Sequence, residues 1–343
     1  MDFSLSEERK MLQETVARFF ENSYNDIKKR SEYLDMNDGF SREFWKESSN
    51  LGVISGLISP NFGGLGGSGE DISIIFELIG KSLCIEPFLS SGLLSSTILS
   101  SIKNPKTKLI NQIIDGQLLV SFAHMEMNNR YEDHFVESKA FFENENWKLN
   151  GSKSFVINGD SADKVIISAR IEGKINDKNG IGLFLVDSNK INNRSYNTID
   201  GYRSAELNFD NVNAELLCKD ELALECIIKA NSAGALALSA EAVGIMQVCF
   251  DLTLDYLKTR KQFGKSIGSF QSIQHRMVDM MLEIEQVRSA VMLASSTFET
   301  NSSTRDKNIS AAKNLVGRVG KLIAEESIQL HGGIAMTWEY SIA

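Results

Sequence analysis

Three glycines in the N-terminal third have the spacing of a dinucleotide-binding turn. Gly64, Gly66 and Gly69 match the pattern G-x-G-x-x-G. Such glycines let a backbone turn approach a pyrophosphate, but only where a strand leads into the turn and a helix follows it. The residues on both sides of this segment have helical spacing instead. We therefore interpret the segment as a glycine-rich loop between helices and not as a nicotinamide site.

The histidines and cysteines show no spacing that would bind a metal or form a nucleophile. None of the histidines forms H-x-x-x-H, and the cysteines lack C-x-x-C, so we expect no metal and reduced, buried thiols. A G-x-S-x-G elbow is also absent from the sequence, which argues against acyl transfer through a covalent enzyme intermediate. The histidines are His124, His134, His275 and His331, and the cysteines are Cys84, Cys218, Cys226 and Cys249.

Charge and hydropathy exclude further classes of protein. The net charge of −9 and the lack of a Lys/Arg run argue against a nucleic-acid partner. The longest uncharged stretch, residues 88–102, contains six serines and is shorter than the roughly 20 apolar residues that span a bilayer, so we expect no membrane helix. The acidic N-terminus does not resemble a secretory signal. These features predict a cytoplasmic protein.

The periodicity of the apolar residues changes twice along the chain. Residues 1–117 have mainly helical spacing, beginning with a capping box at Ser4 and Glu7. Residues 118–220 consist of short β-rich runs separated by turn dipeptides such as Asn150-Gly151 and Asn158-Gly159. Residues 221–343 return to long amphipathic helices. We predict an α+β protein with a helical domain, a β domain and a helical bundle, in that order.

Two segments of the last part carry the most specific information. The first reads RKQFG at 260–264 and GSFQ at 268–271, and the second reads QLHGGI at 329–334 and MTWEY at 336–340. Both are similar to signatures of the acyl-CoA dehydrogenase family, in the order that the family has them. The segment PNFGGLG at 60–66 resembles a further family feature, the loop P-x-x-[FY]-G-G-x-G, with one residue fewer after the proline. Within the family, stretches such as LNGSK at 149–153 and EAVG at 241–244 most resemble the small subunit of pimeloyl-CoA dehydrogenase.

The resemblance implies a fold and a reaction. The family has an N-terminal helical domain, a middle β-barrel or sandwich domain and a C-terminal four-helix bundle. Its FAD-dependent enzymes oxidise the α,β bond of an acyl-CoA to the trans-2-enoyl-CoA: a carboxylate removes the α-proton and the β-hydrogen leaves as hydride to flavin N5. The implied partners are an acyl-CoA substrate, an electron-transfer flavoprotein or similar acceptor, and further subunits in a homo- or hetero-oligomer.

The resemblance also assigns residues to the cofactor. Arg260 and Phe263 would contact the FAD of a neighbouring subunit, with the Arg260 charge on the pyrophosphate. Gln271 would hydrogen-bond the adenosine half. Three residues of the second signature would line the adenosine and pyrophosphate: Gln329, Gly332 and Gly333. Taken one at a time, these residues also have an interpretation that needs no cofactor: Arg260 would be a cation at a helix end, and the glycine pair would end a helix.

The β domain departs from the family pattern. The typical flavin loop T-E-P-G-x-G-S-D aligns with MEMNNRYE at 125–132, where only the glutamate is unchanged. The following W-I-T-N-G strand reads FVING at 155–159, so that Ile157 replaces the threonine expected near flavin N5. Flavin contact from this domain would then depend on backbone groups and on stacking by Phe155.

No carboxylate occupies either usual position of the catalytic base. One position lies on a loop after the second signature, and because the sequence ends at Ala343 we expect an incomplete gene product. The other falls on Gly234. Glu241 lies about two helical turns further along, among small uncharged residues, and is the remaining candidate. A structural glutamate within the bundle is the alternative interpretation.

Three hypotheses follow for the function. The first is an FAD-dependent acyl-CoA dehydrogenase that acts in a homo- or hetero-oligomer. The second is a non-catalytic subunit that lends residues such as Arg260 and Gln271 to the FAD site of a related chain. The third is a flavin oxidase or monooxygenase on the same scaffold. Acyl-chain length, including a preference for dicarboxylic acyl groups, is open in all three.

Overall fold

The chain divides into two compact units in the computed structural model, which describes residues 6–24, 26–129, 131–337 and 340–342. The first unit contains Met1–Arg30, Ser68–Cys84 and Ala235–Ala343, and the second contains Ser31–Gly67 and Ile85–Gly234. The boundary falls inside the longest helix, α7 (Glu221–Thr259), so one helix contributes to both units.

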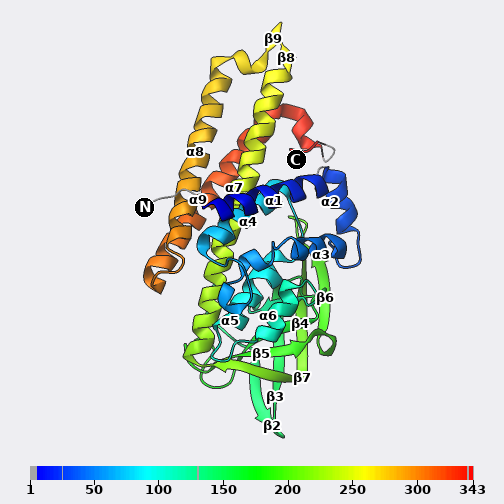
Figure 1. The fold of residues 1–343 in the computed structure, drawn as a ribbon, viewed down its shortest axis with the longest axis vertical. Helices are drawn as coiled ribbons and strands as arrows, with labels where there is room; N and C mark the ends of the chain where they lie inside the picture. Colours follow the sequence, from blue (N-terminus) through cyan, green and yellow to red (C-terminus); the bar gives the residue numbers. More distant parts are fainter. Residues whose placement is uncertain (1–5, 25, 130, 338–339, 343) are drawn as a thin grey trace. The chain divides into compact units, whose positions relative to one another are not determined.

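The first unit consists of long helices (Figure 1). Helix α8 packs against both α4 and α9, and α1 packs against α4. A short hairpin connects α7 to α8 and lies beyond the ends of both helices (Figure 1). The elements are α1 (Glu7–Ser23), α4 (Gly69–Ser82), the later part of α7, β8 (Lys261–Gln262), β9 (Lys265–Ser266), η5 (Ile267–Ser269), α8 (Gln271–Ser296), α9 (Ser302–His331) and η6 (Gly332–Met336).

Helices α4 and α7 cross at unusually close range, because each contributes a glycine to the crossing. A Cβ atom on Gly80 would lie 2.0 Å from the Glu241 carbonyl oxygen, and a Cβ on Gly244 would lie 2.1 Å from the Glu77 carbonyl oxygen. Any larger residue would therefore overlap the backbone of the facing helix. The two glycines fix how close the backbone of Glu241 comes to α4.

Serines cap two of the helix starts in this unit, those of α4 and α1. At α4, Ser68 and Asp71 form a capping box: the Asp71 amide donates to Ser68 Oγ, and the Ser68 amide donates to Asp71 Oδ2 at 3.1 Å. At α1 the cap is Ser6, whose Oγ accepts from the Arg9 amide. The predicted box at Ser4 lies outside the described residues. The glycine-rich segment is a loop between η2 (Pro60–Phe62) and α4, as predicted.

The second unit is built on a mixed sheet with the strand order β1-β4-β2-β3-β7-β5. Strands β1 and β4 run parallel, whereas β3 pairs antiparallel with the long, bent β7, to which β6 also pairs. The buried core of the sheet includes Leu149, Val165 and Phe184. The strands are β1 (Val120–Ala123), β2 (Lys139–Glu143), β3 (Asn146–Ile157), β4 (Lys164–Arg170), β5 (Ile181–Asp187), β6 (Asn192–Asn197) and β7 (Arg203–Lys219).

Helical segments complete the second unit. The π-helix η3 contacts β1, with Ser95 Oγ donating to the Val120 carbonyl at 2.7 Å. Helix α2 (Ile27–Leu34) begins in the first unit and ends in the second. The other segments are α3 (Arg42–Asn50), η1 (Ser55–Leu57), η2, η3 (Phe88–Ser95), α5 (Ser96–Ser101), α6 (Thr107–Ile114), η4 (Ser188–Lys190) and the first part of α7.

The turn predicted at Asn150-Gly151 was wrong. These residues lie inside β3, at a register shift in its pairing with β7, and a Cβ on Gly151 would lie 2.6 Å from Ser138 Oγ. The glycine therefore serves a bulge and a close side-chain approach rather than a hairpin. The turn between β2 and β3 is formed by Asn144 and Glu145, both of which have positive φ.

Helix α7 alone is long and apolar enough, among the described helices, to cross a membrane by length and composition. Half of its most apolar window is buried inside the protein, as in the core helix of a globular protein. The expectation of no membrane helix was drawn from a different stretch, residues 88–102, and it stays a prediction.

Candidate functional site

An aromatic stack in the first unit links the last turn of α7, which precedes the first signature segment, to the second signature segment. The rings of Tyr256, one turn before the end of α7, and His331, the last residue of α9, are stacked with centroids 4.5 Å apart. The edge of Tyr340 contacts both rings. His331 is buried, and its Nδ1 lies 2.8 Å from the Ser327 carbonyl oxygen. The stack brings residues 260–271 and 329–333, which are far apart in sequence, to one end of the helices.

Arg260 and Phe263 project from this end into solvent. Arg260 directly follows α7, with its amide donating to the Tyr256 carbonyl at 2.8 Å, and no ion pair of its guanidinium occurs among the residues that the structure describes. Phe263 is at the tip of the β8–β9 hairpin with a φ of 56° and is 89% exposed. An exposed aromatic ring held on a tight hairpin suits contact with another molecule.

Gln271, Gln329 and the glycine pair are likewise exposed. Gln271 is the first residue of α8, and Gly332 ends α9 with a φ of 70°. A Cβ on Gly332 or Gly333 would meet nothing within 4 Å, so the backbone of both residues is open to an approaching group. An open glycine backbone allows close approach of a ligand and an exposed arginine can bind a phosphate, so these residues suit FAD.

Phe155 and Ile157 lie in the second unit, at the end of β3. The pairing of β3 with β7 shifts between Lys153 and Val156, and Phe155 within this bulge has a φ of 52° and is 48% exposed. Its backbone amide hydrogen-bonds the Tyr196 hydroxyl. The Ile157 carbonyl accepts from Ser121 Oγ at 3.0 Å. The predicted site residues thus form two groups, one in each unit.

A buried polar network beside this bulge was missed by the sequence analysis. Lys153 is fully buried, and its Nζ donates to Glu126 Oε1 at 2.6 Å, to Ser168 Oγ at 2.9 Å and to the His124 carbonyl at 3.2 Å. Ser168 Oγ also lies 2.9 Å from His124 Nδ1. Two features of the sequence could have indicated this network. Glu126 is the one unchanged residue of the aligned flavin loop, and Lys153 is a charged residue within a β-rich run.

The network sets the charges of its members. Burial raises the pKa of Glu126, but the Lys153 charge and the hydrogen bonds from Lys153 and Ser138 outweigh it, so that the carboxylate pKa lies below its ordinary value. Burial, with the nearby Lys153 charge, lowers the pKa of His124 to about 3. Burial lowers the pKa of Lys153, although the Glu126 charge and hydrogen bond raise it. The three acceptors around Nζ suit an ammonium group, which makes the pair charged, and His124 is neutral at neutral pH.

The buried histidine predicts a pH-dependent stability. Because the folded-state pKa of His124 lies below the ordinary value of 6.5, the unfolded chain binds this proton first, and stability falls as the pH is lowered through 6.5. We expect a loss of roughly 1 kcal/mol between pH 6.5 and 5.5, a range above that in which most carboxylates titrate. The free energy of unfolding, measured with urea at each pH, should depend less steeply on pH in His124→Asn than in the wild type. The asparagine keeps an acceptor for Ser168. Equal slopes for both proteins would contradict the assignment.

Glu241 lies half-buried on α7 at the close crossing with α4. Gly234, the other position weighed for the base, faces apolar side chains: a Cβ there would lie 3.0 Å from Leu94 Cδ2 and 3.8 Å from Leu89 Cδ1. A carboxylate at position 234 would need Leu94 to move. Of the two α7 positions considered, only 241 carries an acid.

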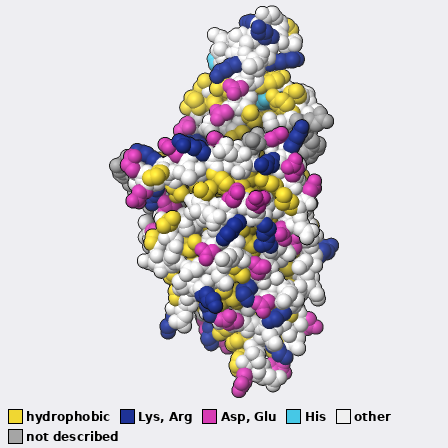
Figure 2. All heavy atoms as spheres, turned by 45° about the vertical axis from the view of Figure 1, so that its right-hand side comes forward, with side chains coloured by type: hydrophobic (Ala, Val, Ile, Leu, Met, Phe, Trp, Pro, Cys, Tyr) yellow, Lys and Arg dark blue, Asp and Glu magenta, His cyan; other side chains and the backbone are white. Residues whose placement is uncertain are grey.

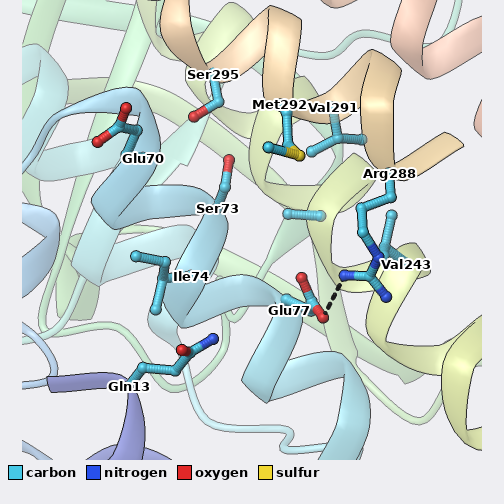
Figure 3. Close-up of a pocket in the computed structure, with 11 residues that line it drawn as sticks. Gln13, Glu70, Ser73, Ile74, Glu77, Val243, Arg288, Val291, Met292 and Ser295 are labelled. Carbon is cyan, nitrogen blue, oxygen red and sulfur yellow. Dashed lines mark hydrogen bonds and ion pairs between the residues drawn. The ribbon is translucent and has the colours of Figure 1, made fainter. Parts of the chain in front are cut away.

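A separate pocket of about 190 Å³ lies in the first unit between α1, α4, α7 and α8 (Figure 3). Its wall combines apolar side chains such as Ile74 and Met292 with the Glu77–Arg288 ion pair, whose closest atoms are 2.8 Å apart. Burial raises the pKa of Glu77, but Arg288 and Lys81 lower it by more, to below its ordinary value. None of the described lining residues is a predicted site residue, and Glu241 does not face this pocket.

Charged side chains of both signs are interspersed over the face drawn in Figure 2. No continuous basic stripe crosses this face, where Lys and Arg alternate with Asp and Glu. That distribution accords with the net charge of −9.

Comparison with known proteins gives the same family along most of the chain. The family model "Acyl-CoA dehydrogenase, N-terminal domain" matches residues 6–113, and "Acyl-CoA dehydrogenase, C-terminal domain" matches residues 224–343. The mitochondrial long-chain specific acyl-CoA dehydrogenase of Sus scrofa is 28% identical over 352 residues, which cover 98% of this chain and 80% of the relative.

Solved structures share the fold. Butyryl-CoA dehydrogenase from Megasphaera elsdenii superposes with a TM-score of 0.89 at 22% identity, covering 100% of this chain and 92% of that one. The ChsE4–ChsE5 complex from Mycobacterium tuberculosis gives a TM-score of 0.87 at 19% identity, covering 100% and 91%. The predicted fold class is therefore confirmed, with helical N- and C-terminal parts around a β domain.

Proposed function

Because this chain belongs to the acyl-CoA dehydrogenase family, whose members are FAD-dependent oxidoreductases acting on CH–CH groups, we propose that it oxidises an acyl-CoA thioester to the trans-2-enoyl-CoA. The observation that carries the proposal is the Tyr256–His331 stack, which links the end of α7, just before the first signature segment, to the second segment. There Arg260 and the open backbone of Gly332 and Gly333 can hold an anionic dinucleotide.

The roles of the chain's own residues follow from their chemistry. Bound FAD supplies the acceptor for the β-hydrogen, which leaves as hydride. Arg260 would neutralise the pyrophosphate, Gln271 and Gln329 would hydrogen-bond the adenosine half, and Phe155 would stack against the flavin ring. We assign Glu241 as the acceptor of the α-proton, since it is half-buried within a helix of small residues. Product analysis tests the reaction directly: acyl-CoA incubated with the protein and an artificial electron acceptor should lose two hydrogens.

An oligomer is part of the proposal. Arg260 and Phe263 project outward from the β8–β9 hairpin, as residues that reach the FAD of a neighbouring subunit would. A related structure of the same fold is described as a complex of two named chains, ChsE4 and ChsE5, which supports pairing with a related subunit as one form of assembly. The other form is a homo-oligomer, and sedimentation of the purified protein distinguishes them.

Replacing Arg260 should weaken cofactor binding. Arg260→Gln removes the charge-assisted contact to the pyrophosphate, and we expect FAD affinity to fall about tenfold or more, measured by flavin fluorescence. The matched control is Lys261→Gln, which removes the adjacent exposed charge of the same hairpin. An equal loss in both variants would indicate a general charge effect, and no loss in Arg260→Gln would contradict the assigned role.

A non-catalytic subunit is the second candidate. The segment aligned with the flavin loop favours it. Glu126 of this segment forms an ion pair with the buried Lys153, and Met127 and Tyr131 are 86% and 91% exposed. These exposed apolar side chains could contact the surface of a partner protein as well as a flavin. If this candidate is correct, the purified chain should bind FAD only after a related acyl-CoA dehydrogenase chain is added.

A further inference from the structure

The buried ion pair of the second unit ties together segments that are distant in sequence. Lys153 is on β3, and Glu126 follows β1. Glu126 Oε1 accepts from Ser138 Oγ at 2.7 Å, and its Oε2 accepts from the Glu137 amide at 2.5 Å, just before β2 begins. Ser168, which accepts from Lys153, is on β4. One charge pair thus joins β3 and β4 to the segments that follow β1 and precede β2.

The pair is saturated with hydrogen bonds. Each of the three protons of the Lys153 ammonium has an acceptor: Glu126, Ser168 and the His124 carbonyl. Both carboxylate oxygens of Glu126 accept backbone amides, from Glu137 and Ser138. A buried charge pair with all its bonds made is directional, which an apolar contact is not. The positions of the connected segments are therefore fixed relative to one another.

The residue after Lys153 begins the bulge that exposes Phe155. The Ser154 amide leaves the ladder with β7 and donates to the Met125 carbonyl at 2.9 Å, so the bulge is bonded to the segment that contains Glu126. Phe155 then adopts a φ of 52°, a backbone conformation that is strained for a bulky residue. Such a conformation persists only where its surroundings hold it in place.

We propose that the Lys153–Glu126 ion pair is a positioning device, which holds the bulge at Ser154 and Phe155 in the conformation that presents the Phe155 ring to the flavin. The inference rests on the proposed FAD-dependent function. Lys153 and Glu126 do not touch the cofactor themselves in this account, since both are buried, and they act through the Ser154–Met125 hydrogen bond. His124 stays neutral beside Lys153, so that no second positive charge competes within the network.

The test removes the pair without leaving a buried charge. A single Lys153→Met or Glu126→Gln change would strand one charge and risk unfolding the protein. The double variant K153M/E126Q has no stranded charge, and the glutamine keeps one oxygen that can accept a backbone amide. The matched control is K164M/D187N, which removes a more exposed ion pair between β4 and β5 of the same sheet.

Two readouts separate this inference from the proposed function. The first is hydrogen exchange of the peptide containing Ser154, measured without FAD: the double variant should exchange about tenfold faster or more, and the control variant should match the wild type. The second is FAD binding, where the double variant should bind more weakly with an altered visible circular dichroism of the flavin. Unchanged exchange in a folded double variant would overturn the inference. A wild-type protein that binds no FAD would overturn the proposed function and leave the exchange result to decide on the ion pair.

Discussion

Replacing Glu241 with glutamine should lower kcat at least about a hundredfold. The variant keeps the size and hydrogen-bonding capacity of the side chain but cannot accept the α-proton, and general-base catalysis typically contributes about 100- to 10,000-fold. An α-proton beside a thioester is too weakly acidic to leave without a positioned base, so the loss should appear in the chemical step. Single-turnover flavin reduction by acyl-CoA measures that step directly.

Two controls accompany this variant. Glu225→Gln makes the same chemical change at an exposed position of α7 and should leave the rate unchanged. FAD content and the unfolding midpoint of Glu241→Gln should match the wild type, because the assigned role is chemical. A stable, FAD-loaded Glu241→Gln protein that reduces its flavin at the normal rate would show that Glu241 only supports the bundle.

Replacing Gly244 with alanine should destabilise the first unit by about 3 kcal/mol. The new methyl group would lie 2.1 Å from the Glu77 carbonyl oxygen, so α4 and α7 must move apart. Gly80→Ala should have a similar effect, because its methyl group would lie 2.0 Å from the Glu241 carbonyl oxygen. Since this crossing sets the position of Glu241, both variants should also slow flavin reduction. Chemical denaturation and single-turnover kinetics measure the two effects.

Glycines in open positions provide the control for this prediction. Gly317 and Gly320 lie within α9, and a Cβ on either would meet nothing within 4 Å. Alanine is favoured over glycine inside a helix by roughly 1 kcal/mol, so Gly317→Ala and Gly320→Ala should leave stability unchanged or raise it. A Gly244→Ala protein as stable as the Gly317→Ala protein would mean that α4 and α7 do not pack as closely as described.

Contiguous features were predictable from the sequence. Each signature segment is a short run of residues that can be recognised without the fold. Helical periodicity likewise predicted that residues 1–117 are mainly helical, as α1 to α6 are. The hairpin turn at Asn150-Gly151 was predicted wrongly, since the same dipeptide can serve a turn or a bulge and only the pairing partner decides. Strand β6 lies within the predicted β domain, but its residues are polar and largely exposed, so they lack the alternation that marks a half-buried strand.

Features that depend on distant residues were not predictable in the same way. Glu126 and Lys153 are 27 residues apart, and only the sheet brings them within hydrogen-bonding distance. The Tyr256–His331 stack likewise needs α7 and α9 to end near one another. The candidate site residues of each unit are predicted from the sequence, whereas the contacts that hold them in position come from tertiary packing.

Anaerobic titration of the FAD-loaded protein with acyl-CoAs tests the central claim most directly. Short, medium, long and dicarboxylic acyl-CoAs are added in turn while the visible flavin absorbance is followed. The account predicts that at least one class bleaches the bound flavin and is converted to its trans-2-enoyl-CoA, and that class identifies the substrate. Bound flavin that no acyl-CoA reduces would contradict an acyl-CoA dehydrogenase activity of this chain and favour the non-catalytic subunit.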